Sequence, residues 1–408
     1  MKSENNLEEL DMSFKDWNEI YFKELCSYKT GRLNSNAAVE NGTYPFFTCS
    51  PQVLKTNTFS FDQDAILLAG NNANGIFHLK YYNGKFDAYQ RTYVISSKDT
   101  SKVDNVYLYY YLALKLNYLK DISVGSATKF LTKGILDNIL IKYPDYKTMK
   151  FIGSILRNID EKIELNNQMN ETLEEMAQAL FKRWFVDFEF PNEEGKPYKS
   201  SGGEMVESEL GMIPKGWSVK SLDQIASFLN GLAMQKFRPN EDEDSLPVLK
   251  IKELRQEKVT SDSDRCTVNI DSKYKVNDGD FIFSWSGTLD ARIWCGGEVG
   301  LNQHLFKVTS DLYPKWFYYM WVVEYLHQFI RIAADRATTM GHIKRQHLTE
   351  AQVLVPSREQ LDKMGKVLAP IIEKIIQNKV EKRSLESLRD TVLPKLMSGE
   401  IRVSDLKS

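Results

Sequence analysis

The chain has 408 residues, of which 42% are hydrophobic and 26% are charged, a composition typical of a globular protein with two or three domains. It carries 53 Lys and Arg against 55 Asp and Glu, and this net charge of −2 argues against a protein coated in basic surface. The first 16 residues are polar and acidic, unlike a signal peptide, and no apolar run reaches membrane-spanning length. We therefore expect a cytoplasmic protein that makes no contact with a membrane.

One plan occurs twice along the chain. Trp17 and Gly31 recur as Trp217 and Gly231, 200 residues later. After residues 144 and 356 the separation is fixed at 212, and identical residues recur as Ile159/Ile371, Glu161/Glu373, Lys162/Lys374, Ile163/Ile375, Asn166/Asn378, Leu173/Leu385 and Glu174/Glu386. A repeat of this kind predicts two similar folded modules.

Each copy has short strands first and helices last. Runs rich in β-branched and aromatic residues predict strands, and apolar residues at helical spacing predict a helix between them. In the first copy, strands are predicted at 44–47, 64–70, 93–95 and 139–143, with a helix at 106–119. In the second copy, strands are predicted at 246–249, 280–287 and 353–355, with a helix at 316–332.

Each copy then ends in a long helix. Apolar residues recur every three or four positions over 152–184 and 367–396, which predicts one apolar seam on a helix of roughly 35 residues, about 50 Å long. Two such helices in one chain bury their seams most simply on each other. Asn166 and Asn378 occupy the same seam position, where a buried Asn fixes pairing register; a solvated edge position is the alternative.

These patterns divide the chain into five predicted segments. They are a first module at 1–150, a central helix at 151–189, a linker rich in Gly, Ser and Glu at 190–212, a second module at 213–357 and a C-terminal helix at 358–408. The predicted fold class is α+β, with two similar mixed α/β modules.

Several motifs, taken together and in duplicated order, resemble one known family over essentially the whole chain. They are IDEKIELN at 159–166, LFKRWFVDF at 180–188, IPKGW at 213–217, LNQH at 301–304 and LPKLMSGEI at 393–401. By these motifs the chain resembles the specificity subunit of Type I restriction-modification systems. The resemblance implies two target recognition domains joined by two long antiparallel helices that form a coiled coil, related by a pseudo-two-fold internal repeat.

The resemblance also implies a function and partners. Each recognition domain would read one half of an asymmetric bipartite site in double-stranded DNA, and the helices would dock two methyltransferase (modification) subunits. Motor-nuclease (restriction) subunits would complete the complex. S-adenosylmethionine, ATP and Mg²⁺ are expected on those partner subunits, and no cofactor is expected in this chain.

Candidate DNA-contacting residues lie in three loop sets of each module, where polar side chains that donate and accept can reach base edges. In the first module they are Asn71, Asn72, Asn74, Lys80, Lys85, Tyr89, Gln90, Arg91, Thr128, Lys129 and Lys133. In the second they are Ser284, Trp285, Ser286, Thr288, Arg292, Gln303, His304, Arg336, Thr338, Thr339, His342, Lys344 and Arg345. Asn and Ser in such loops also cap turns. Lys129, Lys133, Lys344 and Arg345 suit phosphates better than bases.

The sequence carries no motif of a known catalytic site. In a nuclease-like string, Pro144-Asp145 followed by Asp160-Glu161-Lys162, Asp160 and Lys162 fall in the predicted helix. The repeat partner has Ser357 and Ile372 in place of the two aspartates. The five histidines have no metal-ligand spacing, and the four cysteines form no CxxC pair. We expect a non-catalytic subunit. The alternatives are a stand-alone enzyme that cuts or modifies DNA, and a coiled-coil scaffold that binds proteins.

Overall fold

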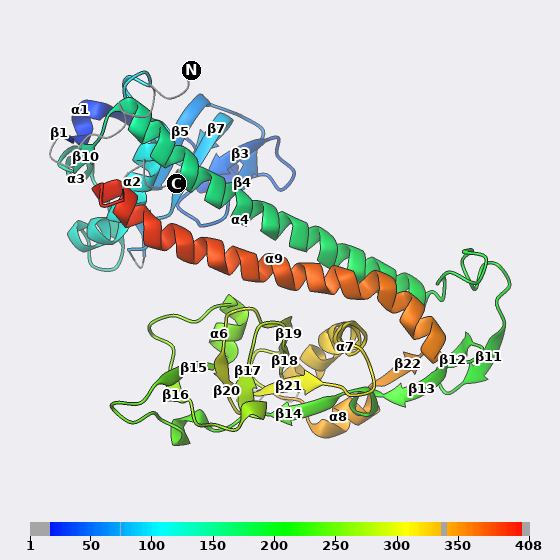
Figure 1. The fold of residues 1–408 in the computed structure, drawn as a ribbon. Helices are drawn as coiled ribbons and strands as arrows, with labels where there is room; N and C mark the ends of the chain where they lie inside the picture. Colours follow the sequence, from blue (N-terminus) through cyan, green and yellow to red (C-terminus); the bar gives the residue numbers. More distant parts are fainter. Residues whose placement is uncertain (1–16, 74, 336–340, 402–408) are drawn as a thin grey trace, which may run out of the picture. The chain divides into compact units, whose positions relative to one another are not determined.

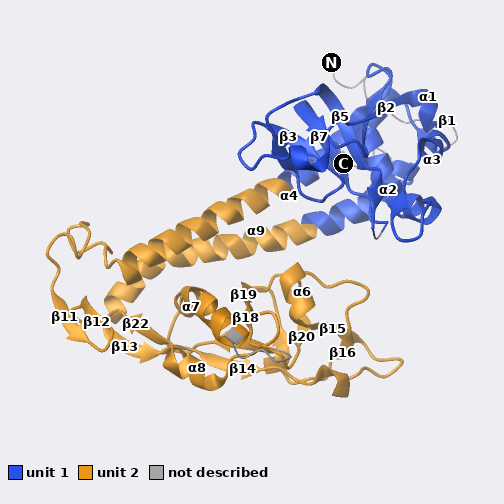
Figure 2. Cartoon of the chain, turned by 180° about the vertical axis from the view of Figure 1, so that it is seen from behind, with its two compact units in different colours: residues 1–162, 385–408 blue, residues 163–384 orange. Residues whose placement is uncertain are grey.

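The computed structural model describes residues 17–73, 75–335 and 341–401 of the chain (Figure 1). The chain divides into two compact units, residues 1–162 with 385–408 and residues 163–384 (Figure 2). The division falls inside both long helices, so each of them contributes residues to both units. Unit 1 therefore joins two separate stretches of the sequence, whereas unit 2 is one continuous stretch.

Unit 1 is built on a six-stranded sheet with the strand order β2-β8-β5-β7-β3-β4. Neighbouring strands are antiparallel except for β3 and β7. The strands are β2 (Cys26–Thr30), β3 (Tyr44–Phe47), β4 (Leu54–Thr56), β5 (Phe61–Ala69), β7 (Leu79–Ala88) and β8 (Thr92–Ser97). Two small ladders join β1 (Asn18–Tyr21) to β10 (Leu140–Tyr143) and β6 (Asn71–Asn72) to β9 (Lys129–Phe130). The four strands predicted in the first copy are confirmed.

Helix α2 (Asn105–Ile122) confirms the helix predicted at 106–119. It begins where the Asp104 carboxylate accepts a hydrogen bond from the backbone N–H of Tyr107, at 3.0 Å. Tyr107, Leu108 and Leu112 are fully buried in the unit 1 core. Shorter helices are α1 (Phe22–Leu25) and α3 (Lys133–Asp137).

Unit 2 contains two four-stranded sheets, β14-β21-β18-β19 and β16-β15-β20-β17. Their strands are β14 (Ser227–Asn230), β15 (Ser245–Leu249), β16 (Arg265–Thr267), β17 (Lys275–Val276), β18 (Phe281–Ser284), β19 (Asp290–Ile293), β20 (Val299–Leu301) and β21 (Leu305–Thr309). A separate ladder pairs β13 (Ser218–Ser221) with β22 (Gln352–Val355). The helices of this unit include α5 (Leu222–Ile225), α6 (Ile251–Gln256), α7 (Lys315–Asp335) and α8 (Arg345–Glu350).

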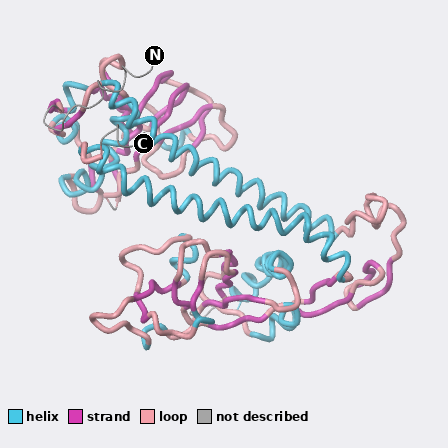
Figure 3. Tube along the Cα trace, in the orientation of Figure 1, coloured by secondary structure: helices cyan, strands magenta, loops and turns pink. Residues whose placement is uncertain are grey.

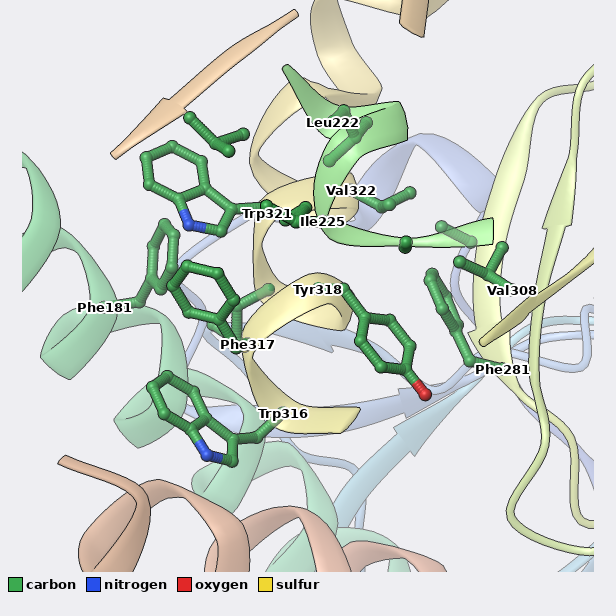
Figure 4. Packing of buried hydrophobic residues seen from close by; sticks show 14 of the residues in the cluster. Phe181, Leu222, Ile225, Phe281, Val308, Trp316, Phe317, Tyr318, Trp321 and Val322 are labelled. Atoms are coloured by element: carbon green, nitrogen blue, oxygen red, sulfur yellow. The ribbon is translucent and has the colours of Figure 1, made fainter. Parts of the chain in front are cut away.

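The core of unit 2 is packed around aromatic side chains of α7 (Figure 4). Phe181 stands edge-on to Trp321 with ring centroids 5.0 Å apart, and Phe281 contributes from the sheet. Trp316 and Phe317 are almost fully buried. Burying aromatic rings of this size is a major source of stability, so α7 anchors the sheet to the long helix that carries Phe181.

The two long helices are α4 (Tyr146–Phe181) and α9 (Arg358–Ser398), with 36 and 41 residues. At 1.5 Å per residue they are about 54 and 62 Å long. Helix α4 begins earlier than the sequence predicts, because the Asp145 carboxylate accepts hydrogen bonds from the backbone N–H groups of Lys147 and Thr148 and so caps its first turn.

Within unit 2 the two helices run antiparallel. The Asn378 amide donates to the Asn170 side-chain oxygen at 2.9 Å, and the Asn166 amide donates to Glu381 at 2.9 Å. Asn166 and Asn378 are 0% and 1% exposed, so both lie buried in the seam and neither is a solvated edge residue. Their side-chain oxygens find no hydrogen-bond partner in the described structure.

The predicted linker at 190–212 contains ordered structure, which the sequence did not indicate. Strands β11 (Met205–Ser208) and β12 (Gly211–Pro214) form a hairpin (Figure 3). Phe190 is 2% exposed and stacks on Trp217 with ring centroids 5.1 Å apart. The Gly and Ser residues form turns, while the aromatic side chains fix the segment to the unit 2 core.

In the described part of the chain, no helix combines the length and the apolar character that crossing a membrane requires.

The buried amides yield a stability prediction. Replacing Asn170 and Asn378 together by Leu removes a polar pair and one unsatisfied oxygen, and we expect unfolding to require about 1–3 kcal/mol more free energy. Asn378→Leu alone leaves the Asn170 oxygen without its donor and should destabilise the protein. Denaturant unfolding measures both, with exposed Gln168→Leu as the control; a double variant less stable than the single one would contradict this account.

Candidate nucleic-acid interface

In unit 1, the three predicted loop sets meet at one end of the sheet. Asn71 and Asn72 form β6, which pairs with β9, so Asn71 lies opposite Phe130 and Asn72 opposite Lys129. The Arg91 guanidinium lies over the Phe130 ring, 5.5 Å from its centroid. All three loop sets therefore contribute to a single surface, the unit 1 cluster of Asn71, Asn72, Arg91, Lys129 and Phe130.

A tight turn places Gln90 beside this cluster. The backbone N–H of Thr92 donates to the Tyr89 carbonyl at 2.8 Å and closes the turn that connects β7 and β8. Gln90 is exposed and Tyr89 is half-buried. Thr128 is half-buried in the hairpin that leads into β9, where Val124 pairs with Phe130.

Cys49 also belongs to this surface, although the sequence analysis did not select it. Its thiol lies 3.1 Å from the Asn71 side-chain oxygen and 3.5 Å from the Arg91 carbonyl oxygen. A single cysteine after a short strand carries no local signal for such a position, because only the fold brings residue 49 to residue 71.

Three predicted lysines do not join the unit 1 cluster. Lys80 donates to the Ser50 carbonyl at 2.5 Å, and burial lowers the pKa of its ammonium group. Lys85 lies opposite Asp62, which is seven residues from the Asn71 end of β5, or about 23 Å along the strand. Lys133 lies 5.9 Å from the centroid of the Tyr28 ring. Asn74 lies outside the described residues.

Unit 2 brings a matching set of residues together, the unit 2 cluster of Trp285, Ser286, Gln303, His304 and His342. Ser286 pairs with His342 as an isolated antiparallel bridge, and the Ser286 hydroxyl lies 3.0 Å from His304 Nδ1. The Trp285 ring lies 6.3 Å from each of the two imidazole rings, measured between centroids. Gln303 Nε2 lies 3.4 Å from His304 Nε2.

Asn230 is a further member of this surface that the sequence analysis missed. Its side-chain oxygen accepts a hydrogen bond from the Trp285 indole N–H at 3.0 Å, and the residue is exposed. Its position just before the repeated Gly231 was the one available signal.

Two predicted residues of the second module face inward or are already paired, which corrects the sequence prediction. Ser284 is 0% exposed and donates to the Thr288 carbonyl at 2.9 Å, so DNA cannot reach its hydroxyl in this structure. Arg292 forms ion pairs with Asp290 at 2.7 Å and with Glu257 at 3.3 Å. Burial opposes its charge, but these carboxylates outweigh burial and raise the pKa of Arg292. Thr288 is exposed.

Arg345 is held by its own module. Its guanidinium donates to the Phe228 carbonyl at 3.1 Å and lies 5.5 Å from the centroid of the Phe306 ring. Lys344, at the start of α8, is exposed and better placed for a phosphate. Three further candidates, Arg336, Thr338 and Thr339, lie outside the described residues.

The nuclease-like string does not assemble an acidic site. Asp145 caps the first turn of α4, whereas Asp160 accepts hydrogen bonds from Arg389 at 2.8 Å and from the Tyr110 hydroxyl at 2.6 Å. Fifteen residues of helix separate the two carboxylates by about 22 Å. Among residues 17–73, 75–335 and 341–401, no group of three or more His, Cys, Asp or Glu side chains is arranged to hold a metal ion.

Neighbouring Lys344 and Arg345 allow a matched test of these assignments. Arg345→Ala removes a hydrogen bond and a ring contact and should lower the free energy of unfolding by about 0.5–1.5 kcal/mol. Lys344→Ala should leave stability unchanged while weakening DNA binding and reducing its salt dependence. Denaturant unfolding and salt titrations of binding separate the two effects; equal stability with weaker binding for both variants would show that Arg345 contacts DNA.

Comparisons with known proteins agree with one another. Residues 14–175 and 214–387 each match the family described as the Type I restriction modification DNA specificity domain. The Type I restriction enzyme MjaIX specificity subunit of Methanocaldococcus jannaschii is 31% identical over 311 residues, covering 74% of this chain and 70% of that protein. The MjaVIII specificity subunit of the same organism is 24% identical, covering 96% of this chain and 94% of that protein.

A solved structure has a similar fold. The crystal structure of the Type-I restriction-modification system S subunit from M. genitalium matches with a TM-score of 0.65 at 16% identity, covering 97% of this chain and 98% of that one.

Proposed function

Because the chain belongs to the Type I restriction-modification DNA specificity family, we propose that each of its two modules reads one half of an asymmetric bipartite site in duplex DNA. The observation that carries this proposal is the pair of clusters described above, one in each unit. Each gathers side chains from loops that are far apart in the sequence onto one surface.

The chemistry of the two clusters suits base edges. Asn and Gln amides donate and accept, the Arg91 guanidinium donates, and imidazole groups do either. Ser286 is only 6% exposed, so its hydroxyl supports His304 and is not offered to a base. Lys129 in unit 1 and Lys344 in unit 2 are exposed or half-exposed cations beside these groups and would hold phosphates. The two sets differ in composition, which suits two unlike half-sites.

The partner proposal is that α4 and α9 dock two methyltransferase subunits, with motor-nuclease subunits completing the assembly. Support comes from large apolar side chains left exposed on helices that are otherwise polar outside their seam: Leu165, Met176, Val367 and Leu388 are 49%, 49%, 45% and 49% exposed. In this proposal the chain itself is non-catalytic, and S-adenosylmethionine, ATP and Mg²⁺ bind to the partners.

The proposed division of labour can be tested with purified components. The isolated chain, incubated with duplex DNA, S-adenosylmethionine, ATP and Mg²⁺, should neither methylate nor cut, and addition of the methyltransferase subunits should produce methylation. Binding by the assembled complex should weaken steeply with rising salt, because Lys and Arg contacts release counterions. Turnover by the homogeneous chain would favour a stand-alone enzyme, and a complex that never binds duplex would favour a protein scaffold.

A module exchange tests whether each module reads its own half-site. Residues 17–145, which end where α4 begins, are replaced by the corresponding segment of another specificity subunit. Because the unit 2 cluster is untouched, the methylated sites of the host genome should change in one half-site and keep the other. A change in both half-sites would contradict the proposal. So would the finding that the unaltered protein directs methylation to a single continuous palindrome.

A further inference from the structure

The two clusters share one structural element, a tight turn with glutamine at its second position. In unit 1 the Thr92 N–H donates to the Tyr89 carbonyl at 2.8 Å, across Gln90 and Arg91. In unit 2 the Leu305 N–H donates to the Asn302 carbonyl at 3.0 Å, across Gln303 and His304. Gln90 and Gln303 therefore hold the same place in two turns of the same kind.

The same backbone contacts fix both turns. The Gly31 N–H donates to the Thr92 carbonyl at 3.1 Å, and the Gly231 N–H donates to the Leu305 carbonyl at 3.0 Å. An isolated parallel bridge joins the first residue of each turn to the segment that follows the glycine: Tyr89 pairs with Leu33, two residues after Gly31, and Asn302 pairs with Leu232, one residue after Gly231. The correspondence thus extends to the supporting chain on either side.

Both glycines are required by this close approach. A Cβ atom on Gly31 would lie 1.9 Å from the Ala88 carbonyl oxygen, and one on Gly231 would lie 2.3 Å from the Asn302 carbonyl oxygen. No side chain fits at those distances. The close approach of the glycine therefore fixes the backbone of each turn, and the glutamine side chain takes no part in that contact.

The residue after each glutamine is already engaged with the neighbouring ladder. Arg91 lies over Phe130 of β9, and His304 lies beside Ser286, which pairs with His342. Gln90 is exposed and Gln303 is half-buried, so each amide stands at the edge of its cluster. The two turns thus have glutamine at the same position and different residues, Arg91 and His304, after it.

We propose, on the premise of the proposed function, that Gln90 and Gln303 are equivalent base-reading residues and that each recognises an adenine at corresponding positions of the two half-sites. A glutamine amide donates to adenine N7 and accepts from adenine N6, a pairing that no other base offers in the major groove. Two turns fixed by the same backbone contacts present this amide at the same place in each module. The half-sites consequently share this adenine and differ at the bases that Arg91 and His304 face.

The test uses the assembled chain and methyltransferase subunits. The wild-type site is first read from the methylated genome, and binding is then measured by competition with duplexes that carry every single-base change. Gln90→Ala should relax selectivity at one adenine of the first half-site, and Gln303→Ala at the corresponding adenine of the second. Binding to the cognate duplex should fall about 5- to 150-fold in each case.

Selectivity at the other half-site is the folding control for each variant, because the unaltered module should still recognise its half-site normally. The isosteric Gln90→Glu and Gln303→Glu provide a second test, since a carboxylate accepts from cytosine N4 and should shift preference from adenine to cytosine at the same position. The inference is overturned if the relaxed bases are not adenine, if they do not correspond between half-sites, or if binding weakens equally for every sequence, as for a phosphate contact. A wild-type complex without sequence preference would instead overturn the proposed function.

Discussion

Each unit completes its hydrophobic core with residues from both long helices. In unit 1, Leu156 of α4 and Leu396 of α9 are both fully buried in one cluster, although 240 residues separate them. In unit 2, Phe181 of α4 packs in the same core as Leu361 and Leu368 of α9. Neither half of the sequence therefore holds a closed core of its own, and the pairing of α4 with α9 is what makes the repeated modules into folded units.

The repeat has diverged at one polar contact between these helices, although several of their polar and apolar residues are identical in the two copies. In unit 1, Asp160 of α4 binds Arg389 of α9. Their repeat partners, at the fixed offset of 212, are Ile372 and Ala177, which are both buried in the core of unit 2. One copy thus ties its helices with an ion pair where the other uses apolar contact.

Unit 2 has its own polar connection to the helices. Lys379 of α9 binds Glu257, which ends α6, at 2.8 Å, and lies 3.7 Å from Glu174 of α4. Burial opposes the charge of this lysine, yet the two carboxylates outweigh burial and raise the pKa of Lys379. A buried cation that loses its partners is costly, so these contacts favour one packing arrangement of the second module on its helices over alternatives that bury a similar apolar area.

The sequence predicted the elements well and the orientation of single side chains poorly. Periodicity sufficed to find α4, α9 and the strands. It overestimated the buried seam, because Met176, Val367 and Leu388 follow the periodic spacing but are 49%, 45% and 49% exposed. It could not show that Ser284 faces inward, because all four residues of β18 are buried and the strand has no exposed face for alternation to report. Nor could it show that Arg345 binds the Phe228 carbonyl, because that contact depends on a partner 117 residues away.

In the two clusters, backbone contacts hold the turns in place and side chains supply the groups that would contact DNA. This separation suits a protein with two unlike recognition surfaces. The glycine contacts at Gly31 and Gly231 use only main-chain atoms, so they are indifferent to what the turn residues are. Arg91 in one turn and His304 in the other can therefore differ without moving the turn that carries them. Because the backbone hydrogen bonds that hold each turn do not involve these side chains, selectivity can change in one module without loss of those bonds. A duplicated fold with these properties can keep one architecture while its two halves come to read different sequences.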